Sequence, residues 1–273
     1  MKTPLPNFVL GAILILVFGQ ILHAAPGQDY WGYWDRSDES NYRRIDHGAW
    51  DALLENYVVA GNASGVNRFR YDAMDARDRA RLDDYIAYLA ARDPREFRRN
   101  EQLAYWMNLY NAVSVQAVVE RMPVGKGDIG KSALPLSLWQ KKRIEVAGER
   151  LSLDDIEHRI LRPIWRDHRV LFGLNCATLD CPNMQPSAYT GATVASQLKA
   201  AGRAFVNGDK GVHYDQGQLK ASRLFQVYRS DFAGDDKGLI RLFAHYASDM
   251  KALYLLGFQG AIQYRQDLRL NMP

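Results

Sequence analysis

Hydrophobic and polar positions follow a helical period over the first half of the chain. Residues 50–59 and 75–91 carry apolar side chains at spacings of three and four beneath a charged face, which predicts two amphipathic helices. Asp93 and Pro94 then supply a cap and a first-turn proline for another helix. Further along, residues 101–119 are apolar on nearly every face. This pattern predicts a central helix that is buried on all sides.

After Pro123 the period changes, and short alternating runs separated by glycine-containing turns predict hairpins. The expected elements are hairpins at 143–152 and 212–222, helices at 195–206 and 239–255, and strands at 170–174 and 260–270. We therefore expect an α+β fold: a helical N-terminal half whose central buried helix packs on a small antiparallel sheet. No repeat or linker interrupts residues 26–273, so we expect a single domain.

The first 25 residues have the pattern of a secretory signal peptide. One lysine precedes an apolar stretch of about a dozen residues and a small-residue exit at Ala24 and Ala25. That stretch is shorter than the roughly 20 apolar residues of a spanning helix. We expect residues 1–25 to be cleaved from a periplasmic or secreted protein that has no stable membrane insertion. An uncleaved anchor is the alternative.

Charge and cysteine content exclude several classes of function. The net charge is +4, and acids alternate with bases along the chain, which is typical of solvated helix faces rather than of nucleic-acid binding. A hydrophobic content of 47% is sufficient for one large core. The two cysteines, Cys176 and Cys181, have no second Cys or His pair beside them. We therefore predict neither a metal site nor a cofactor.

The cysteine pair is the most informative feature of the chain. An apolar, strand-like run breaks at Asn175 into a small polar turn, which places Cys176 at the mouth of a strand. Reactive thiols are often found in such a place. The spacing to Cys181 also permits a disulfide, and an oxidising compartment favours one. Both interpretations are open at this point.

Asn108 and Asn111 stand one turn apart on the predicted buried helix, where their amides need partners. They either pin neighbouring loops or orient a substrate amide or a catalytic side chain beside the cysteine turn.

A short helix is predicted to begin after Ser152, with Asp155 completing its cap. At about 100 degrees per residue, Glu157 falls on the flank of the buried side of this helix, and His158 points largely away from that side.

Three motifs occur in order: YWMNLYNA at 105–112, LSLDDIEH at 151–158, and LNCAT at 174–178 followed by CPN at 181–183. In these motifs the chain resembles the domain of unknown function 547 family, from about Trp50 to Asn271. The resemblance implies no settled activity. Family members commonly carry a histidine where this chain has Leu171, and an aromatic pair near the C-terminus that is absent from residues 266–271.

One hypothesis is an exported envelope protein that binds a partner or small ligand, with Cys176 and Cys181 bridged to fix the turn. Such a bridge closes a short loop and adds about 2 kcal/mol by chain entropy. The expected periplasmic or secreted location favours a peptide, a cell-wall fragment or a small thiol as the partner.

The alternative is a thiol-dependent amide hydrolase or acyltransferase with Cys176 as nucleophile. His158 is then the best base, with Glu157, Asp155 or Asn108 orienting it. Asn111, Asn175 and Thr178 are candidate substrate contacts. A cysteine where a buried helix meets a small sheet also occurs in papain-like and transglutaminase-like folds, an analogy of fold alone.

The other histidines are weaker candidates for the base. His168 lies before the predicted strand and so at its opposite end from Cys176, whereas His213 on the later hairpin remains open. His47 and His245 are expected to be surface or half-buried residues.

Overall fold

The computed structural model describes residues 25, 27–61, 64–122, 135 and 137–273. The predicted signal peptide therefore lies almost wholly outside the described residues, and its cleavage stays a prediction. Among the helices that the structure describes, none combines the length and apolarity of a membrane span.

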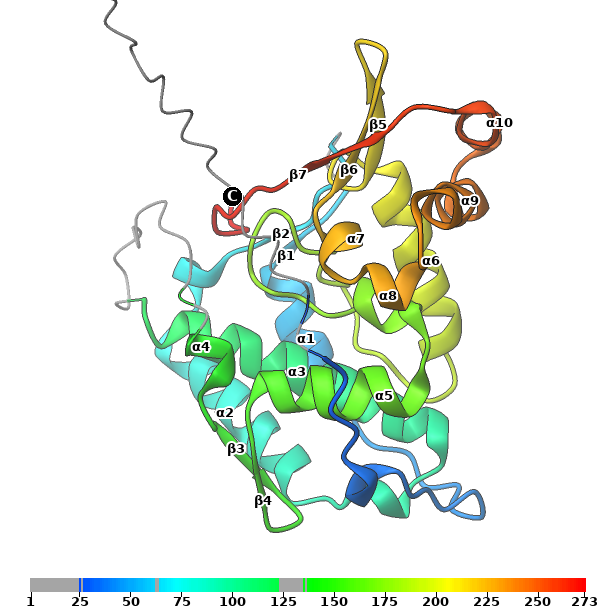
Figure 1. Ribbon diagram of the computed structural model, residues 1–273. Coiled ribbons are helices and arrows are strands. Elements are labelled where there is room, and N and C mark those ends of the chain that lie inside the picture. The colour runs from blue at the N-terminus through cyan, green and yellow to red at the C-terminus, as the bar shows by residue number, and fades with distance from the viewer. Residues whose placement is uncertain (1–24, 26, 62–63, 123–134, 136) are drawn as a thin grey trace, which may run out of the picture.

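Three helices form the N-terminal half: α1 (Gly48–Tyr57), α2 (Ala76–Ala90) and α3 (Arg99–Val119). Helix α2 begins where Asp75 caps it, because the carboxylate accepts from the Asp78 N–H at 2.8 Å. Helix α3 is buried along almost its whole length, as its uniformly apolar sequence predicts. It lies at the centre of the molecule with α2 on one side and α6 on the other (Figure 1).

Seven further α-helices, a π-helix, 3-10 helices and seven short strands complete the described part of the chain. The remaining α-helices are α4 (Ser137–Gln140), α5 (Arg162–Trp165), α6 (Val194–Asn207), α7 (Leu224–Val227), α8 (Arg229–Phe232), α9 (Asp236–Tyr246) and α10 (Asp249–Gly257). A π-helix spans Asp155–Leu161, and 3-10 helices span Gly32–Trp34, Tyr71–Ala73, Pro94–Glu96 and His168–Phe172. The strands are β1 (Val58–Val59), β2 (Arg68–Phe69), β3 (Ile144–Val146), β4 (Glu149–Leu151), β5 (Val212–Asp215), β6 (Gln218–Ser222) and β7 (Ile262–Arg265).

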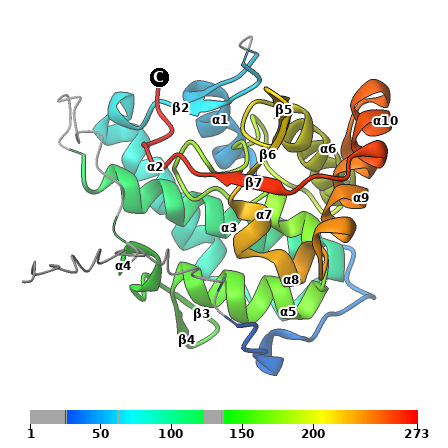
Figure 2. The ribbon, with the colours of Figure 1, turned by 45° about the horizontal axis from the view of Figure 1, so that its top comes forward.

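The α+β prediction is confirmed, and both predicted hairpins form. Strands β3 and β4 pair antiparallel around Ala147 and Gly148, which both have positive φ, as a tight two-residue hairpin turn requires. Strands β5 and β6 also pair antiparallel, but β7 joins β6 in parallel, so this sheet is mixed. Strand β7 returns from α10 across the molecule toward β2 (Figure 2), and this long crossover permits the parallel direction.

Two predicted elements are wrong in detail. The run at 170–174 is not a strand, because a 3-10 helix at His168–Phe172 packs there against α6. A short apolar run that is buried on all sides fits either conformation, and periodicity alone does not separate them. The helix predicted at 239–255 is two helices, because Ala247 and Ser248 are extended between α9 and α10.

A group of packed aromatic rings anchors the segment before the cysteines. Phe172 packs against Phe205, Phe225, Phe232 and Tyr246, with ring centroids 5.4–6.2 Å apart. The next residue, Gly173, has no room for a side chain, since a Cβ there would collide with Met107 of α3 and Leu198 of α6. The chain therefore enters the cysteine turn wedged between two helices.

Candidate functional site

Cys176 and Cys181 form a disulfide, with their Cα atoms 5.6 Å apart. The chain has no other cysteine, so this structure holds no free thiol. Cys176 is half-buried, whereas Cys181 is 1% exposed. The nucleophile of the hydrolase hypothesis needs a thiolate at Cys176, and the bridge removes it. We call residues 175–182 the cysteine loop.

Asn175 shapes this loop from within. Its side-chain oxygen accepts from the Ala177 N–H at 2.9 Å, and its amide nitrogen donates to the Pro182 carbonyl at 3.2 Å. The first bond holds Ala177 in the left-handed region, with φ of 60°, which non-glycine residues seldom adopt. Asn175 is 1% exposed. The structure thus places this predicted substrate contact inside the loop.

One face of α3 holds the start of the cysteine loop. Asn111 donates to the Gly173 carbonyl and accepts from the Asn175 N–H, both at 2.9 Å. Ser114, three residues further along the same face, donates to the Asn175 carbonyl at 2.8 Å. These buried polar groups satisfy one another, which is the loop-pinning interpretation of Asn111. Sequence reasoning missed Ser114, although its spacing of three from Asn111 pointed to it.

Asn108 makes the same kind of paired contact at a second segment. Its side chain donates to the Tyr189 carbonyl at 2.8 Å and accepts from the Tyr189 N–H at 3.0 Å. Asn108 and Asn111 therefore hold backbone rather than the cysteine sulfurs.

The C-terminal segment covers the cysteine loop from the opposite side. The Leu179 N–H donates to the Arg269 carbonyl at 2.8 Å, and the Asn271 N–H donates to the Ala177 carbonyl at 2.8 Å. Thr178 and Leu270 also pair in an isolated antiparallel β-bridge. Nothing in the local sequence predicted this cover, because the two segments are about ninety residues apart in the chain.

Glu157 and His158 lie in the π-helix, in a different polar network. Tyr110 and Tyr228 donate to the Glu157 carboxylate at 3.0 and 2.5 Å. Arg162 donates to His158 Nδ1 at 2.8 Å and pairs with Asp231 at 2.6 Å. Since arginine only donates, Nδ1 of His158 acts as the acceptor and its lone pair is occupied.

The prediction that His158 points away from the core is wrong, because its exposure is 7%. A π-helix has more residues in each turn than the 3.6 assumed at 100 degrees per residue, so the side chains beyond Asp155 are rotated. The cap at Ser152 is confirmed, since its N–H and hydroxyl both donate to Asp155 at 2.7 and 2.6 Å. With Lys142 and Arg159 also contacting it, hydrogen bonds and ion pairs hold the pKa of Asp155 at about 2.

Within the described part of the chain, the polar side-chain contacts of His158 are with Glu157 and Arg162, and those of Cys176 are with Cys181 and Thr178. The structure therefore does not join the proposed base to the proposed nucleophile.

The other histidines contact tyrosines or solvent. His168 Nε2 lies 3.0 Å from the Tyr246 hydroxyl, and His213 is half-buried. His47 is 4% exposed, with Nδ1 2.7 Å from the Tyr85 hydroxyl, and burial lowers its pKa to about 4. Its predicted half-exposed setting is thus wrong, whereas His245 is exposed as expected. In the residues described, no cluster of His, Cys, Asp and Glu has the makings of a metal site.

A pocket of about 390 Å³ opens beside the cysteine loop. Four segments meet there, and they bring four basic and three acidic side chains. The lining residues are Ser64, Val66, Arg68, Leu179, Asp180, Asp209, Lys210, Arg265, Gln266, Asp267 and Arg269. Leu179 and Asp180 belong to the cysteine loop itself. The volume is within the range of small-ligand sites.

Burial alters two charged groups of this pocket. Desolvation raises the pKa of Asp180 to about 6 and lowers that of Lys210 to about 8. Lys210 donates to the Cys181 carbonyl at 2.9 Å, so its ammonium rests directly on the cysteine loop. The pocket and the disulfide are therefore parts of one site.

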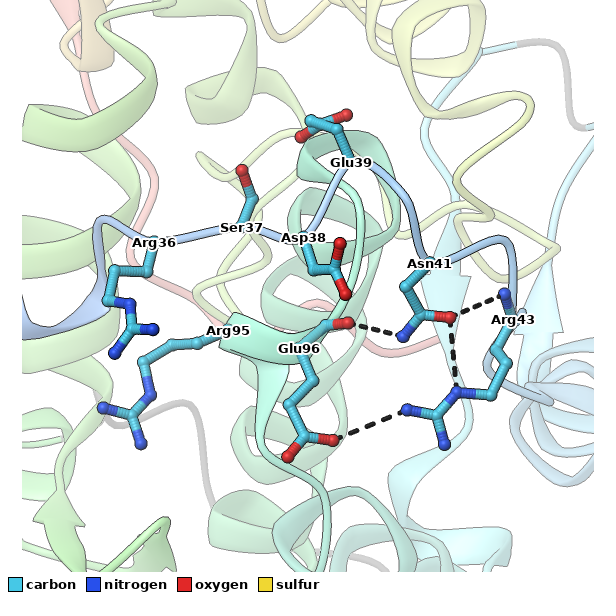
Figure 3. A pocket seen from close by; sticks show the side chains of 8 residues that line it. All are labelled: Arg36, Ser37, Asp38, Glu39, Asn41, Arg43, Arg95 and Glu96. Carbon is cyan, nitrogen blue, oxygen red and sulfur yellow. Dashed lines mark hydrogen bonds and ion pairs between the residues drawn. The ribbon is translucent and has the colours of Figure 1, made fainter.

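A larger pocket, of about 650 Å³, lies between residues 36–43 and the 3-10 helix at Pro94–Glu96 (Figure 3). Its polar side chains largely satisfy one another: Asn41 bonds Glu96 and Arg43, and Arg43 pairs with Glu96 at 3.5 Å. It contains no residue of the cysteine loop, and its ion pairs are exposed. We therefore place the candidate site at the cysteine loop.

Residues 94–206 match the family described as "Protein of unknown function, DUF547". The DUF547 match begins at the 3-10 helix before α3, contains the π-helix and the cysteine loop, and ends in α6. The resemblance drawn from three motifs is confirmed over these residues, which are fewer than the expected span from Trp50 to Asn271. No curated protein matches the chain. No solved structure matches it either, so the comparison with papain-like folds remains an analogy.

Proposed function

We propose that this chain is an exported ligand-binding domain and that the cysteine loop is one wall of its binding pocket. The observation that carries the proposal is the position of the loop: bridged by a disulfide, bonded to α3 on one side and to the C-terminal segment on the other, it supplies Leu179 and Asp180 to the pocket. Because the disulfide, α3 and the C-terminal segment already restrain the loop, it loses little conformational entropy when a ligand binds.

The pocket charges support a ligand that carries both a carboxylate and an amino group. Arg265 and Asp209 line it and attract one another by charge, with no side-chain hydrogen bond of either within the described part of the chain. Both are exposed, so both are available to a ligand. A guanidinium binds a carboxylate in bidentate fashion, and a carboxylate binds an ammonium. A short peptide or a cell-wall fragment with free amino and carboxyl groups has this chemistry.

Export has independent support in the sequence and in the disulfide. Residues 1–25 have the order of charge, apolar core and small residues of a signal peptide. A disulfide is expected to persist in an oxidising compartment. Fractionation of cells that express the full chain tests this part: we expect the protein in the periplasm or medium, with residues 1–25 missing by N-terminal sequencing. Retention in the cytoplasm at full length contradicts it.

Calorimetry on the exported protein tests the binding. Short peptides and muramyl peptides with free termini are titrated beside the same molecules after N-acetylation and C-amidation. We expect Arg265→Gln to weaken binding at least ~10-fold, since it removes a charged hydrogen bond. Arg203→Gln, on an exposed position of α6 outside the pocket, is the matched control and should bind as the wild type does. Equal binding by both variants, or no binding of free-ended ligands, refutes the proposal.

A further inference from the structure

The two sulfur atoms of the bridge have different surroundings. Cys176 is half-buried, whereas Cys181 is 1% exposed. A thiolate that arrives from solvent therefore meets the sulfur of Cys176 and is kept from that of Cys181. Thiol–disulfide exchange depends on which sulfur is reached and on how well the other sulfur leaves.

The buried sulfur has the contacts of a stabilised leaving group. The Thr178 N–H donates to Cys181 Sγ at 3.3 Å, and the Thr178 hydroxyl lies 3.1 Å from the same atom. A bridged sulfur carries no hydrogen, so the hydroxyl is the donor. Donors directed at a sulfur favour its thiolate form over the thiol. The Lys210 ammonium, bonded to the Cys181 carbonyl at 2.9 Å, adds positive charge at this residue.

We propose that the Cys176–Cys181 disulfide is a thiol–disulfide exchange site for small thiols, attacked at Cys176 and opened with Cys181 as the leaving group. A thiolate forms a bond to Cys176 Sγ as the bond between the two protein sulfurs breaks, and Cys181 leaves as a thiolate. A second thiolate then attacks the outer sulfur of this mixed disulfide. Two molecules of small thiol are oxidised to their disulfide, the protein bridge is reduced, and the two thiol protons end on Cys176 and Cys181.

We expect the loop to keep its place when the bridge opens. Asn111 and Ser114 bond its first residue, and the Arg269 carbonyl and Asn271 N–H bond its middle. None of these bonds depends on the disulfide. The two sulfurs therefore stay close after reduction, and the bridge can form again. This activity does not rest on the ligand-binding proposal, because binding is measured on the oxidised protein without added thiol.

Native exchange with glutathione tests the proposal. The oxidised exported protein is incubated in millimolar reduced glutathione without denaturant, quenched with acid and analysed by mass spectrometry. We expect reduction of the native protein, and an intermediate mass with one glutathione on Cys176. A bridge that is reduced only after unfolding in guanidinium overturns the proposal.

Single variants identify the attacked sulfur. With Cys181→Ser, oxidised glutathione should add rapidly to Cys176. With Cys176→Ser, the thiol of Cys181 should stay unmodified in native buffer. Equal modification of the two variants contradicts attack at Cys176.

Thr178 variants test the leaving group. Thr178→Val removes one donor to a developing thiolate and should slow native reduction about tenfold. Thr178→Ser keeps the hydroxyl and should restore the rate, while Thr190→Val controls for the loss of a threonine elsewhere. Circular dichroism checks that each variant is folded. Equal rates for Val and Ser at position 178 contradict stabilisation of the leaving group by the Thr178 hydroxyl.

Discussion

Asn111→Leu is the sharpest test of how the cysteine loop is held. Leucine has nearly the shape of asparagine but neither of its hydrogen-bonding groups. The substitution leaves two buried backbone groups without a partner: the Gly173 carbonyl and the Asn175 N–H, each now bonded at 2.9 Å. An unpaired buried group costs about 1–3 kcal/mol, so the loss of partners for these two groups should lower the free energy of unfolding by about 2–6 kcal/mol.

Urea denaturation followed by tryptophan fluorescence measures this loss. Ser114→Ala removes a single bond to the Asn175 carbonyl and should cost less, about 1 kcal/mol or slightly more. Gln116→Leu, on the same helix, is the matched control because it loses only an exposed bond to Asp83. It should change stability by no more than about 0.5 kcal/mol. If Asn111→Leu is as stable as Gln116→Leu, α3 does not hold the loop and the reasoning fails.

Three further predictions concern the disulfide, Asp180 and the separate network around Glu157. Replacing both Cys176 and Cys181 by alanine should lower the free energy of unfolding by about 2 kcal/mol, because the reduced unfolded chain gains loop entropy; no loss in urea denaturation contradicts this. Burial raises the pKa of Asp180 to about 6, so the folded protein keeps a proton that the unfolded chain loses near pH 4, and stability falls as pH rises between these values. Asp180→Asn should therefore be more stable than the wild type at pH 7, by at most about 3 kcal/mol, and equal to it below pH 4; parallel pH profiles refute this. Glu157→Leu deprives two tyrosine hydroxyls of their acceptor and should destabilise the fold by about 2 kcal/mol or more. The rate of glutathione exchange should stay unchanged. If the folded variant loses exchange, Glu157 takes part in the reaction and this prediction is wrong.

Local sequence patterns were sufficient to predict the main helices and the two hairpins. The helical period of residues 75–91, the uniformly apolar run of α3 and the glycine turns at Gly148 and Gly217 each predicted an element that forms. The cysteine spacing left two interpretations open, and the structure contains the bridge. The need of Asn111 for buried partners was also visible, because a buried amide cannot be left unpaired.

Tertiary context decided the remaining features. Whether residues 168–172 form a strand or a 3-10 helix depends on packing against α6 rather than on hydrophobic period. The π-helix turned His158 inward, which a fixed angle per residue does not foresee. The pocket beside the cysteine loop depends on contacts between Asp180 and the segment at Asp267, far apart in sequence. Such pairings have no local signature.

The state of the two cysteines in the exported protein tests the account most directly. The full chain is expressed with its N-terminal segment, collected from the periplasm or medium, denatured without reductant and treated with iodoacetamide. Intact mass should show no added alkyl group and a mass lower by two hydrogens than that of the reduced chain, as an intact Cys176–Cys181 bridge requires. Alkylation of both cysteines contradicts the bridge, the wall it holds and the exchange site together.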